Sequence, residues 1–275
     1  MADEKKTRIY RIGDYAQKMS VTPDLLKHYE KMGLIRARTT ESGYRYYPFP
    51  ESVPLLECLS LRNYGFSLQQ MRELLYQGNL ASFEQALGAQ AEQIRRSMAR
   101  EQAVLEEYEA QSQWFRRMEN RTLYMLLEEK EDVYFLPHSK HHDFLEDDRI
   151  QALLSKWVEW MPMVKSCRKI ILKSGEDSLR DGVWGLSVPV SLAERFGLPL
   201  NSVVERLPGG RHLICHYILT DETPSATKQL WQTITENAQK HGLPLSGPVQ
   251  QTVLTTLFTP GENVRCGVFS IPVLV

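Results

Sequence analysis

The sequence predicts a multidomain chain, with an N-terminal domain of all-α type, one long helix, and a C-terminal α+β domain built on an antiparallel sheet. Three observations predict this order. Helix start and stop signals crowd residues 1–78, a proline-free stretch with apolar residues at heptad spacing fills residues 79–120, and short β-like runs alternate with two helical stretches over residues 121–275.

The composition is that of an ordinary globular protein. The chain has 275 residues, of which 42% are hydrophobic and 24% charged, enough for two domains with their own cores. It lacks the roughly 18 consecutive apolar residues of a membrane span, and the charged start MADEKKTRIYR is unlike a signal peptide. The four cysteines lie far apart, which disfavours a disulfide framework and suits a reducing compartment. We therefore expect a cytoplasmic protein with no membrane segment.

The first residues are basic and start with two short helices. Residues 1–50 contain ten Lys or Arg and six Asp or Glu, a net charge of +4 in a chain of net charge −1. Thr22 and Pro23 form a strong helix start, because threonine caps free N–H groups and proline suits the first helical position, and Gly33 supplies the stop. The helix between them, PDLLKHYEKM, follows a shorter helix around GDYAQKM. Two short helices, the second with a polar basic face, fit a helix-turn-helix.

A hairpin and a further helix follow. GLIRARTTESGYRYY is typical of strand, turn and strand, with Glu41-Ser42-Gly43 as the turn, because glycine accepts a positive φ. This hairpin forms a wing, in which one arginine stands among three tyrosines. Ser67 and Gln70 predict a capping box that begins another helix.

The segments YRIGDYAQKMSVTPDLLKHYEKMGLI, SGYRYY and LRNYGFSLQQMRELL together resemble the winged helix-turn-helix of MerR-type transcription regulators. The resemblance implies that the helix at 22–32 enters the major groove of double-stranded promoter DNA and that the wing grips the flanking backbone. The DNA-binding residues that it implies are Thr22, Lys27, His28, Tyr29, Gly43, Tyr44 and Arg45. Tyr29 also suits the domain core. Lys27 and His28 depart from the arginine and tyrosine common in the family, which leaves the operator sequence open.

The stretch from Leu80 to Met118 contains no proline, and its apolar residues recur at steps of three, four or seven. This pattern is typical of a coiled-coil seam. The expected dimerisation residues are Leu87, Ile94, Met98, Leu105, Tyr108 and Phe115. A helix packed along its own domain is the alternative. In MerR-type proteins the corresponding helix pairs antiparallel across a twofold axis, so the resemblance implies a homodimer.

Metal-sensing members of that family carry cysteines near the end of this helix, whereas RMENRTLYMLLEEK has none. His138, His141 and His142 form the one possible imidazole cluster, but a loop of exposed histidines is the commoner arrangement. We therefore predict neither a metal nor another cofactor.

The C-terminal part alternates strands with the helical stretches DDRIQALLSKWVEWM and PSATKQLWQTITENAQKHG. Each half reads strand, helix, strand, strand, which suggests an internal duplication. The runs VVERLPGGRHLICHY, GPVQQTVLTTLFTP and GVFSIPV resemble a GyrI-like effector-binding domain. Behind a MerR-type head, this arrangement is similar to multidrug-responsive regulators, in which aromatics and a buried glutamate hold a lipophilic, often cationic compound.

Gln251 stands at the position of that glutamate. We therefore expect neutral or weakly charged lipophilic aromatic effectors, or a carboxylate supplied from elsewhere, with Glu205 as the candidate. The expected ligand-binding residues are Trp157, Trp184, Tyr217, Trp231, Gln251 and Phe258. Plain core packing is the alternative for each aromatic.

These features predict a dimeric, ligand-responsive transcription regulator. By resemblance, it activates a promoter with an over-long spacer by distorting the DNA, and so acts on RNA polymerase indirectly. A C-terminal domain that binds a protein partner is one alternative. A small-molecule hydrolase is another, but no catalytic pairing has interpretable spacing, and the adjacent Cys215 and His216 point to opposite faces of a strand. We predict no catalytic residues.

Overall fold

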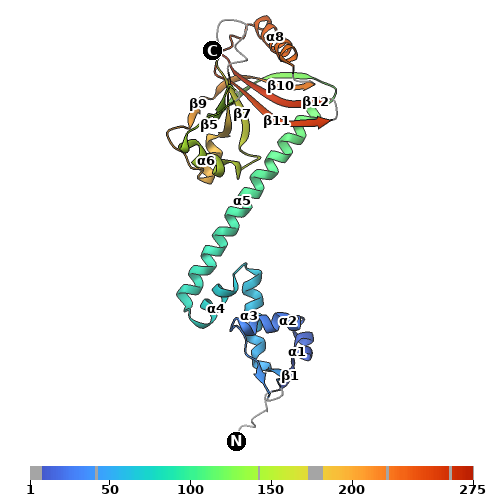
Figure 1. The fold of residues 1–275 in the computed structure, drawn as a ribbon, viewed down its shortest axis with the longest axis vertical. Coiled ribbons are helices and arrows are strands. Elements are labelled where there is room, and N and C mark those ends of the chain that lie inside the picture. The colour runs from blue at the N-terminus through green and yellow to red at the C-terminus, as the bar shows by residue number, and fades with distance from the viewer. Residues whose placement is uncertain are drawn as a thin grey trace. The chain divides into compact units, whose positions relative to one another are not determined.

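The computed structural model describes residues 8–40, 43–141, 143–172, 182–220, 223–259 and 262–274. The chain divides into two compact units, Met1–Arg100 and Glu101–Val275, and helix α5 (Leu80–Met118) begins in the first and ends in the second. Figure 1 shows the elements in chain order, and they confirm the predicted fold class of a helix-turn-helix head, a long helix and an antiparallel sheet domain. The division falls inside this helix, whose bounds lie within the predicted helical segment 79–120.

The first unit is a small winged helix-turn-helix. Its three short strands pair in the order β1-β3-β2, and its helices follow one another with short connections. The elements before α5 are β1 (Ile9–Arg11), α1 (Ile12–Met19), α2 (Pro23–Lys31), β2 (Arg38–Thr39), β3 (Arg45–Pro48), the 3-10 turn η1 (Phe49–Glu51), α3 (Ser52–Asn63) and α4 (Leu68–Tyr76).

The ends of α2 and α4 follow the predicted local signals. Thr22 Oγ1 accepts a hydrogen bond from the Leu25 backbone N–H over 3.2 Å, and Pro23 occupies the first turn of α2. Gly33, just past the end of this helix, has φ +70°, a conformation that glycine adopts without strain. Ser67 and Gln70 form the reciprocal capping box that begins α4. Both helix starts confirm the sequence prediction.

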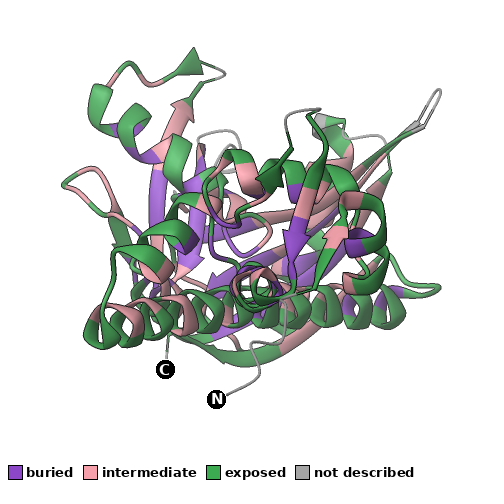
Figure 2. Ribbon diagram, turned by 90° about the horizontal axis from the view of Figure 1, so that it is seen from below, coloured by how far each residue is buried: buried purple, intermediate pink, exposed green. Residues whose placement is uncertain are grey.

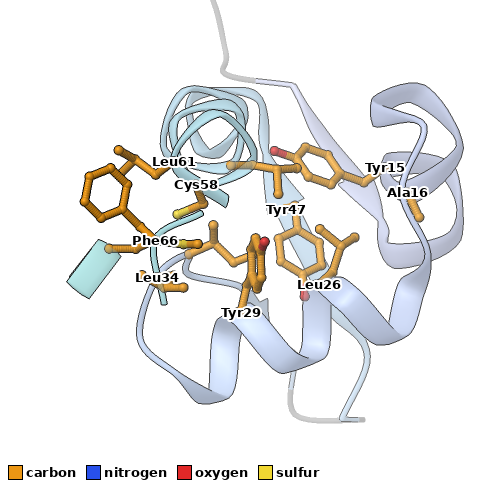
Figure 3. Packing of buried hydrophobic residues seen from close by; sticks show 12 residues of the cluster. Tyr15, Ala16, Leu26, Tyr29, Leu34, Tyr47, Cys58, Leu61 and Phe66 are labelled. Atoms are coloured by element: carbon orange, nitrogen blue, oxygen red, sulfur yellow. The ribbon is translucent and has the colours of Figure 1, made fainter. Parts of the chain in front are cut away.

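The core of this unit is unusually rich in tyrosine. Tyr15, Tyr29 and Tyr47 are buried, and the rings of Tyr15 and Tyr47 stack with their centroids 5.0 Å apart. Figure 3 shows these rings converging with Leu26 and Leu34 between the helices. The second half of the wing, which supplies Tyr47, is therefore part of the core and holds the hairpin against α2.

Helix α5 has 39 residues and two different faces. The six residues of the predicted seam are all exposed, from Leu87 at 37% to Met98 and Tyr108 at 65%. In the second unit, the other face of the helix buries Ala103, Trp114 and Met118. Figure 2 shows the mixture, with the helix largely exposed and only single turns buried.

The second unit is built on a nine-stranded sheet in which every pairing between named strands is antiparallel. Its strands are β4 (Leu123–Lys130), β5 (Val133–Lys140), β6 (Asp143–Phe144), β7 (Lys165–Ile170), β8 (Gly182–Pro189), β9 (Glu205–Leu207), β10 (Gly210–Thr220), β11 (Val249–Thr259) and β12 (Glu262–Pro272). Its helices besides the end of α5 are α6 (Asp148–Val158), α7 (Val190–Phe196) and α8 (Pro224–Lys240).

The strand order repeats within the sheet. The sheet runs β4-β10-β12-β11-β7-β8-β5-β6, so β10-α8-β11-β12 and β5-α6-β7-β8 have the same topology and meet where β11 pairs with β7. This is the strand, helix, strand, strand repeat that the sequence suggested for the two halves.

The two faces of the sheet are covered by different helices. Helix α8 covers one face and packs on Cys215, Tyr217 and Phe269. The last turns of α5 lie against the other face, where Trp114 and Met118 cluster with Cys266. Because side chains alternate along a strand, neighbouring residues of β10, β11 and β12 belong to different environments.

No helix in the described part of the chain is long and apolar enough to cross a membrane.

Candidate functional site

The outer face of α2 carries polar side chains that do not pack into the core. Thr22, Lys27 and His28 are exposed, and Lys27 Nζ lies 3.0 Å from Oδ1 of Asp24. Thr22 and His28 also line a shallow hollow to which α3 contributes Arg62. The sequence pattern alone did not point to Arg62. Its basic side chain in the segment LRNYGF was the available signal, but only the fold brings it beside α2.

The wing is tied to α2 through one carboxylate. Glu30 Oε2 accepts hydrogen bonds from Arg45 Nε at 3.0 Å and from the Tyr47 hydroxyl at 3.3 Å. Gly43 has φ +80°, as the turn requires, and the Tyr44 side chain next to it is exposed. Residues 41 and 42 of the predicted turn lie outside the described residues. Arg45 is thus half-exposed and already paired within the domain.

Tyr29 does not belong to this surface. Only 1% of the residue is exposed, and its ring packs in the core with Leu26 and Tyr47. The reason is helical spacing, because Tyr29 lies three residues after the buried Leu26 and therefore on the inward face. Among the seven residues predicted to contact DNA, Tyr29 is the one whose side chain is buried. It therefore follows the alternative given in the sequence analysis, a role in the domain core.

The second unit contains a cavity of about 490 Å³ on the sheet face opposite α8. Helix α5 forms one wall through Ala103, Ala110 and Trp114, and β10, β11 and β12 form the floor. Such a volume is in the range of sites that hold drug-sized compounds. The apolar part of the lining includes Met163, Ile214, Leu254 and Val268.

Charged residues line the cavity in equal numbers of each sign. They are Glu106, Glu107 and Glu128 against Arg117, Lys130 and Lys165. The Glu107 carboxylate is mostly buried and forms an ion pair with Lys165 Nζ at 2.8 Å. Burial lowers the pKa of Lys130, and the nearby Lys165 adds to this effect.

Several polar atoms in the lining are buried without a partner. The described residues offer no hydrogen-bond partner to Trp114 Nε1, to either ring nitrogen of His216, or to Ser270 Oγ. Burial, together with the positive charges of Arg117 and Lys130, lowers the pKa of His216 to about 4. The imidazole is therefore neutral near pH 7, with one N–H donor and one acceptor. A buried polar group without a partner costs about 1–3 kcal/mol.

The six residues expected to bind a ligand are not among those that line this cavity. Trp157 packs against α6 neighbours and donates to the Pro199 carbonyl over 3.0 Å, and Trp231 meets the Phe269 ring in the α8 core. Trp184 stacks with the Arg168 guanidinium, and Phe258 is 81% exposed near the end of β11. For the buried aromatics the core alternative applies, because a single sequence does not reveal which face of the sheet a helix covers.

The remaining two residues belong to the α8 face of the sheet. Gln251 Nε2 donates to the Tyr217 hydroxyl over 2.8 Å, and both side chains are buried. Gln250, one residue earlier, lines the cavity together with Thr252 and Leu254. The amide of β11 that lines the cavity is thus Gln250, one position before the expected Gln251, because neighbouring residues of a strand lie on opposite faces.

Three further candidates from the sequence are also accounted for. Glu205 pairs with Lys169 Nζ at 2.6 Å and does not line the cavity. In the possible imidazole cluster, His138 is half-buried and burial lowers its pKa. His142 of the same cluster lies outside the described residues. In the described ranges, no three or more His, Cys, Asp or Glu side chains come together in a group that could hold a metal ion. Cys215 lies in the α8 core and His216 lines the cavity, so these neighbours do point to opposite faces.

The fold and the polar face of α2 define the first unit as a winged helix-turn-helix of the DNA-binding class. Residues 10–78 match the family described as MerR HTH family regulatory protein, and this N-terminal domain belongs to the MerR family. The transcriptional regulator ZntR of Escherichia coli strain K12 is 40% identical over 68 residues, which are 24% of this chain and 48% of ZntR. The chain thus spans about half the length of that relative.

Two solved structures are similar over longer stretches, although distantly. The EcmrR–DNA complex, seen by cryo-electron microscopy in a complex named EcmrR-RPo, covers 96% of this chain at 16% identity with a TM-score of 0.38. A hydrolase from Listeria innocua covers 56% of this chain at 11% identity with a TM-score of 0.36.

Proposed function

We propose that this protein is a DNA-binding transcription regulator that responds to a small molecule held in the cavity of its second unit. The observation that carries the proposal is the MerR-type winged helix-turn-helix of residues 10–78 joined, in one chain, to a domain with a cavity of about 490 Å³. A DNA-binding head needs no such cavity for its own work, so the two features together favour regulation by a ligand.

In this proposal α2 enters the major groove and presents Lys27 and His28 to the DNA, with Thr22 at the start of the helix near the backbone. The wing residues Gly43, Tyr44 and Arg45 contact the flanking phosphates or sugars. The Arg45 guanidinium can bind a phosphate while it keeps its ion pair with Glu30, because the Arg45 side chain is half-exposed and the ion pair is open to solvent. We add Arg62 as a further phosphate contact, because it borders the same hollow as Thr22 and His28.

The protein acts as a homodimer in this account. The exposed seam of α5 supports this, because an apolar stripe on a long helix is stable in water only when it is covered. An antiparallel pair of α5 helices joins two heads across a twofold axis, so the operator is an inverted repeat. Distortion of an over-long promoter spacer is the mode of activation by which such a dimer acts on RNA polymerase.

The position of the cavity supports the link between ligand and DNA. Its wall includes Ala103, Ala110 and Trp114, which belong to the same continuous helix that carries the seam. A ligand shifts an equilibrium only through different contacts in the two states. A compound in this cavity meets that condition if it binds more tightly to one position of α5 than to another.

A hydrolase is not favoured by the site. Cys215 and His216 lie on opposite faces of β10, and among the described residues no hydroxyl or thiol is hydrogen-bonded to either ring nitrogen of His216.

The test is selection of bound duplexes from a random DNA pool by the purified full-length protein, followed by binding titrations on the enriched sequence. We expect enrichment of one inverted repeat. Lys27→Ala and Arg45→Ala should each weaken binding and lower the salt slope by about one. Lys156→Ala, an exposed lysine on α6, is the matched control and should bind like the wild type. A pool without enrichment, or equal binding by all three variants, would reject the proposal.

A further inference from the structure

The exposed face of α2 carries a carboxylate beside its basic side chains. Asp24 lies in the first turn of α2, and its side chain is 90% exposed. Helical spacing puts it on the same face as Lys27 and His28, which are also exposed. DNA is a polyanion, so a carboxylate on a surface that meets DNA lowers the affinity unless it forms a contact that compensates for the repulsion.

The fold of α2 does not depend on this carboxylate. The cap of the helix is Thr22, whose Oγ1 accepts the hydrogen bond from the Leu25 backbone N–H. Asp24 Oδ1 accepts instead from Lys27 Nζ over 3.0 Å, and an ion pair as exposed as this one contributes little to stability. An acidic side chain in the first turn also interacts favourably with the helix dipole. A residue with that role alone would leave the base preference of the protein unchanged.

The place of Asp24 in the helix brings it to the base edges. In helix-turn-helix proteins, the N-terminal residues of the second helix contact the bases in the major groove. Helix α2 is the second helix of this motif, and Asp24 is its second residue. The ion pair with Lys27 holds the carboxylate on the exposed face and offsets its charge near the phosphates. Asp24 is therefore placed to meet a base.

The chemistry of a carboxylate selects the base. A carboxylate only accepts hydrogen bonds, so the phosphate oxygens, which are acceptors too, offer Asp24 no bond. The donors in the major groove are the N4 amino group of cytosine and the N6 amino group of adenine. Adenine has the acceptor N7 beside its amino group, and guanine and thymine present acceptors on the same edge. These acceptors repel a carboxylate, so cytosine is the base that fits.

We propose that Asp24 determines part of the operator sequence, because its carboxylate accepts a hydrogen bond from N4 of a cytosine at one fixed position in each half-site. Lys27 is the positioning residue that holds the carboxylate in place. Its ammonium has three donors, so it still reaches a phosphate while it is paired with Asp24. This inference rests on the proposed function, since it names a base that the same DNA-binding surface reads.

The test repeats the selection from a random DNA pool with the full-length wild type, Asp24→Ala and Asp24→Asn. The wild type should enrich an inverted repeat with one nearly invariant cytosine in each half. Asp24→Ala should select the same repeat without a preference at that position. Asp24→Asn should prefer adenine there, because an asparagine amide bonds to N6 and N7 of adenine together.

Binding titrations give the magnitude. Replacement of that cytosine by thymine in one half-site, with its pairing base, should weaken binding of the wild type about tenfold. Asp24→Ala should bind the two duplexes within about twofold of each other. Asp14→Ala removes an exposed carboxylate from the first turn of α1 and is the matched control, which should keep the tenfold preference of the wild type.

The outcomes separate this inference from the proposed function. Selection of the same cytosine by the wild type, Asp24→Ala and Asp24→Asn would overturn the role of Asp24 in base reading, and so would a wild-type operator without a fixed cytosine. DNA binding by the protein would stand in both cases. A pool that the wild type does not enrich would overturn both. If Asp24→Ala does not fold by circular dichroism, Asp24→Asn, which keeps the size of the side chain, decides between the outcomes.

Discussion

Gln251 Nε2 donates a hydrogen bond to the hydroxyl of Tyr217 over 2.8 Å, beneath helix α8. The bond joins β11 to β10 across the intervening strand β12. It satisfies two polar groups that are otherwise enclosed by apolar side chains, so the pair stabilises this half of the sheet. Because Gln251 is committed to the α8 face, the preceding residue, Gln250, is the one that faces the cavity.

The first prediction follows from this alternation. Gln250→Glu adds a carboxylate to a cavity whose lining otherwise has three acidic and three basic side chains, so the affinity for the fused-ring cation 10-methylacridinium should rise about tenfold. Gln251→Glu adds the same charge on the opposite face. It should leave the cation affinity unchanged and lower the free energy of unfolding by about 1–3 kcal/mol, because the new carboxylate is buried beside Tyr217 and loses its solvation. Titration and thermal melts of both variants check this. Equal cation affinities in the two variants would contradict the assignment of faces.

The second prediction concerns Gly267 on β12, which lies over the same tyrosine. A Cβ atom there would stand 2.5 Å from the Tyr217 hydroxyl oxygen and 2.8 Å from the Thr252 carbonyl oxygen. Gly267→Ala should therefore lower the free energy of unfolding of the second unit by about 1–3 kcal/mol, because backbone and side chain must both shift. Gly13→Ala in α1, where nothing lies within 4 Å, is the control and should not lower the melting temperature. Calorimetry that found the two variants equally stable would argue against this packing.

The third prediction is a pH dependence at the turn before β10. Asp132 accepts hydrogen bonds from the Gly209 N–H at 2.8 Å and from Arg206 Nε at 2.7 Å, and these bonds lower its pKa. A carboxylate whose pKa is lower in the folded state stabilises the fold above its unfolded pKa of about 3.9, and this contribution is lost as the pH falls through the folded value. The melting temperature of Asp132→Asn should therefore fall less than that of the wild type on acidification below about pH 5.

Glu236→Gln, which removes an exposed carboxylate from α8, provides the comparison for that experiment. The melting temperature of this variant should fall with pH as steeply as that of the wild type. If the melting temperatures of the wild type and Asp132→Asn fell equally on acidification, the Asp132 contacts would not stabilise the fold.

The fourth prediction concerns the seam of α5. Leu105 is half-exposed on the stripe that we propose to pair with a second copy. Leu105→Glu buries a charge in that pairing, so analytical ultracentrifugation should find a monomer where the wild type sediments as a dimer. Gln93→Glu adds the same charge to an exposed position away from the stripe and should remain dimeric. A dimeric Leu105→Glu protein would move the interface away from this seam.

The sequence predicted the parts of the molecule that depend on local chemistry. The threonine cap and proline of α2, the capping box of α4 and the positive φ of Gly33 are all decided within a few residues. The alternation of elements in the C-terminal unit and its repeated order were also readable, because strand and helix periodicities differ.

The residues that line the cavity could not be predicted from the sequence in this way. Whether Trp157 and Trp231 line a pocket or a core depends on which face α6 and α8 cover, and the sheet joins residues such as Val249 and Ile170 that lie far apart in sequence. The carboxylate of Glu30 that holds Arg45 is 15 residues away from it, so the ion pair also appears only with the fold. In β11, a shift of one residue exchanges the face of the sheet on which a side chain lies, and the sequence does not show which face borders a cavity.

The central claim is that a compound in the cavity controls the promoter-bound protein. The most direct measurement is transcription in vitro from a promoter that carries the selected inverted repeat, with bacterial RNA polymerase, and with and without acridone, a neutral fused-ring aromatic of the class that the sequence predicts as effector. The account predicts that acridone changes the transcript yield several-fold with the wild type and leaves it unchanged with Ala110→Trp, in which the cavity is filled. A yield that does not respond to acridone with the wild type, or that responds equally with Ala110→Trp, would contradict it.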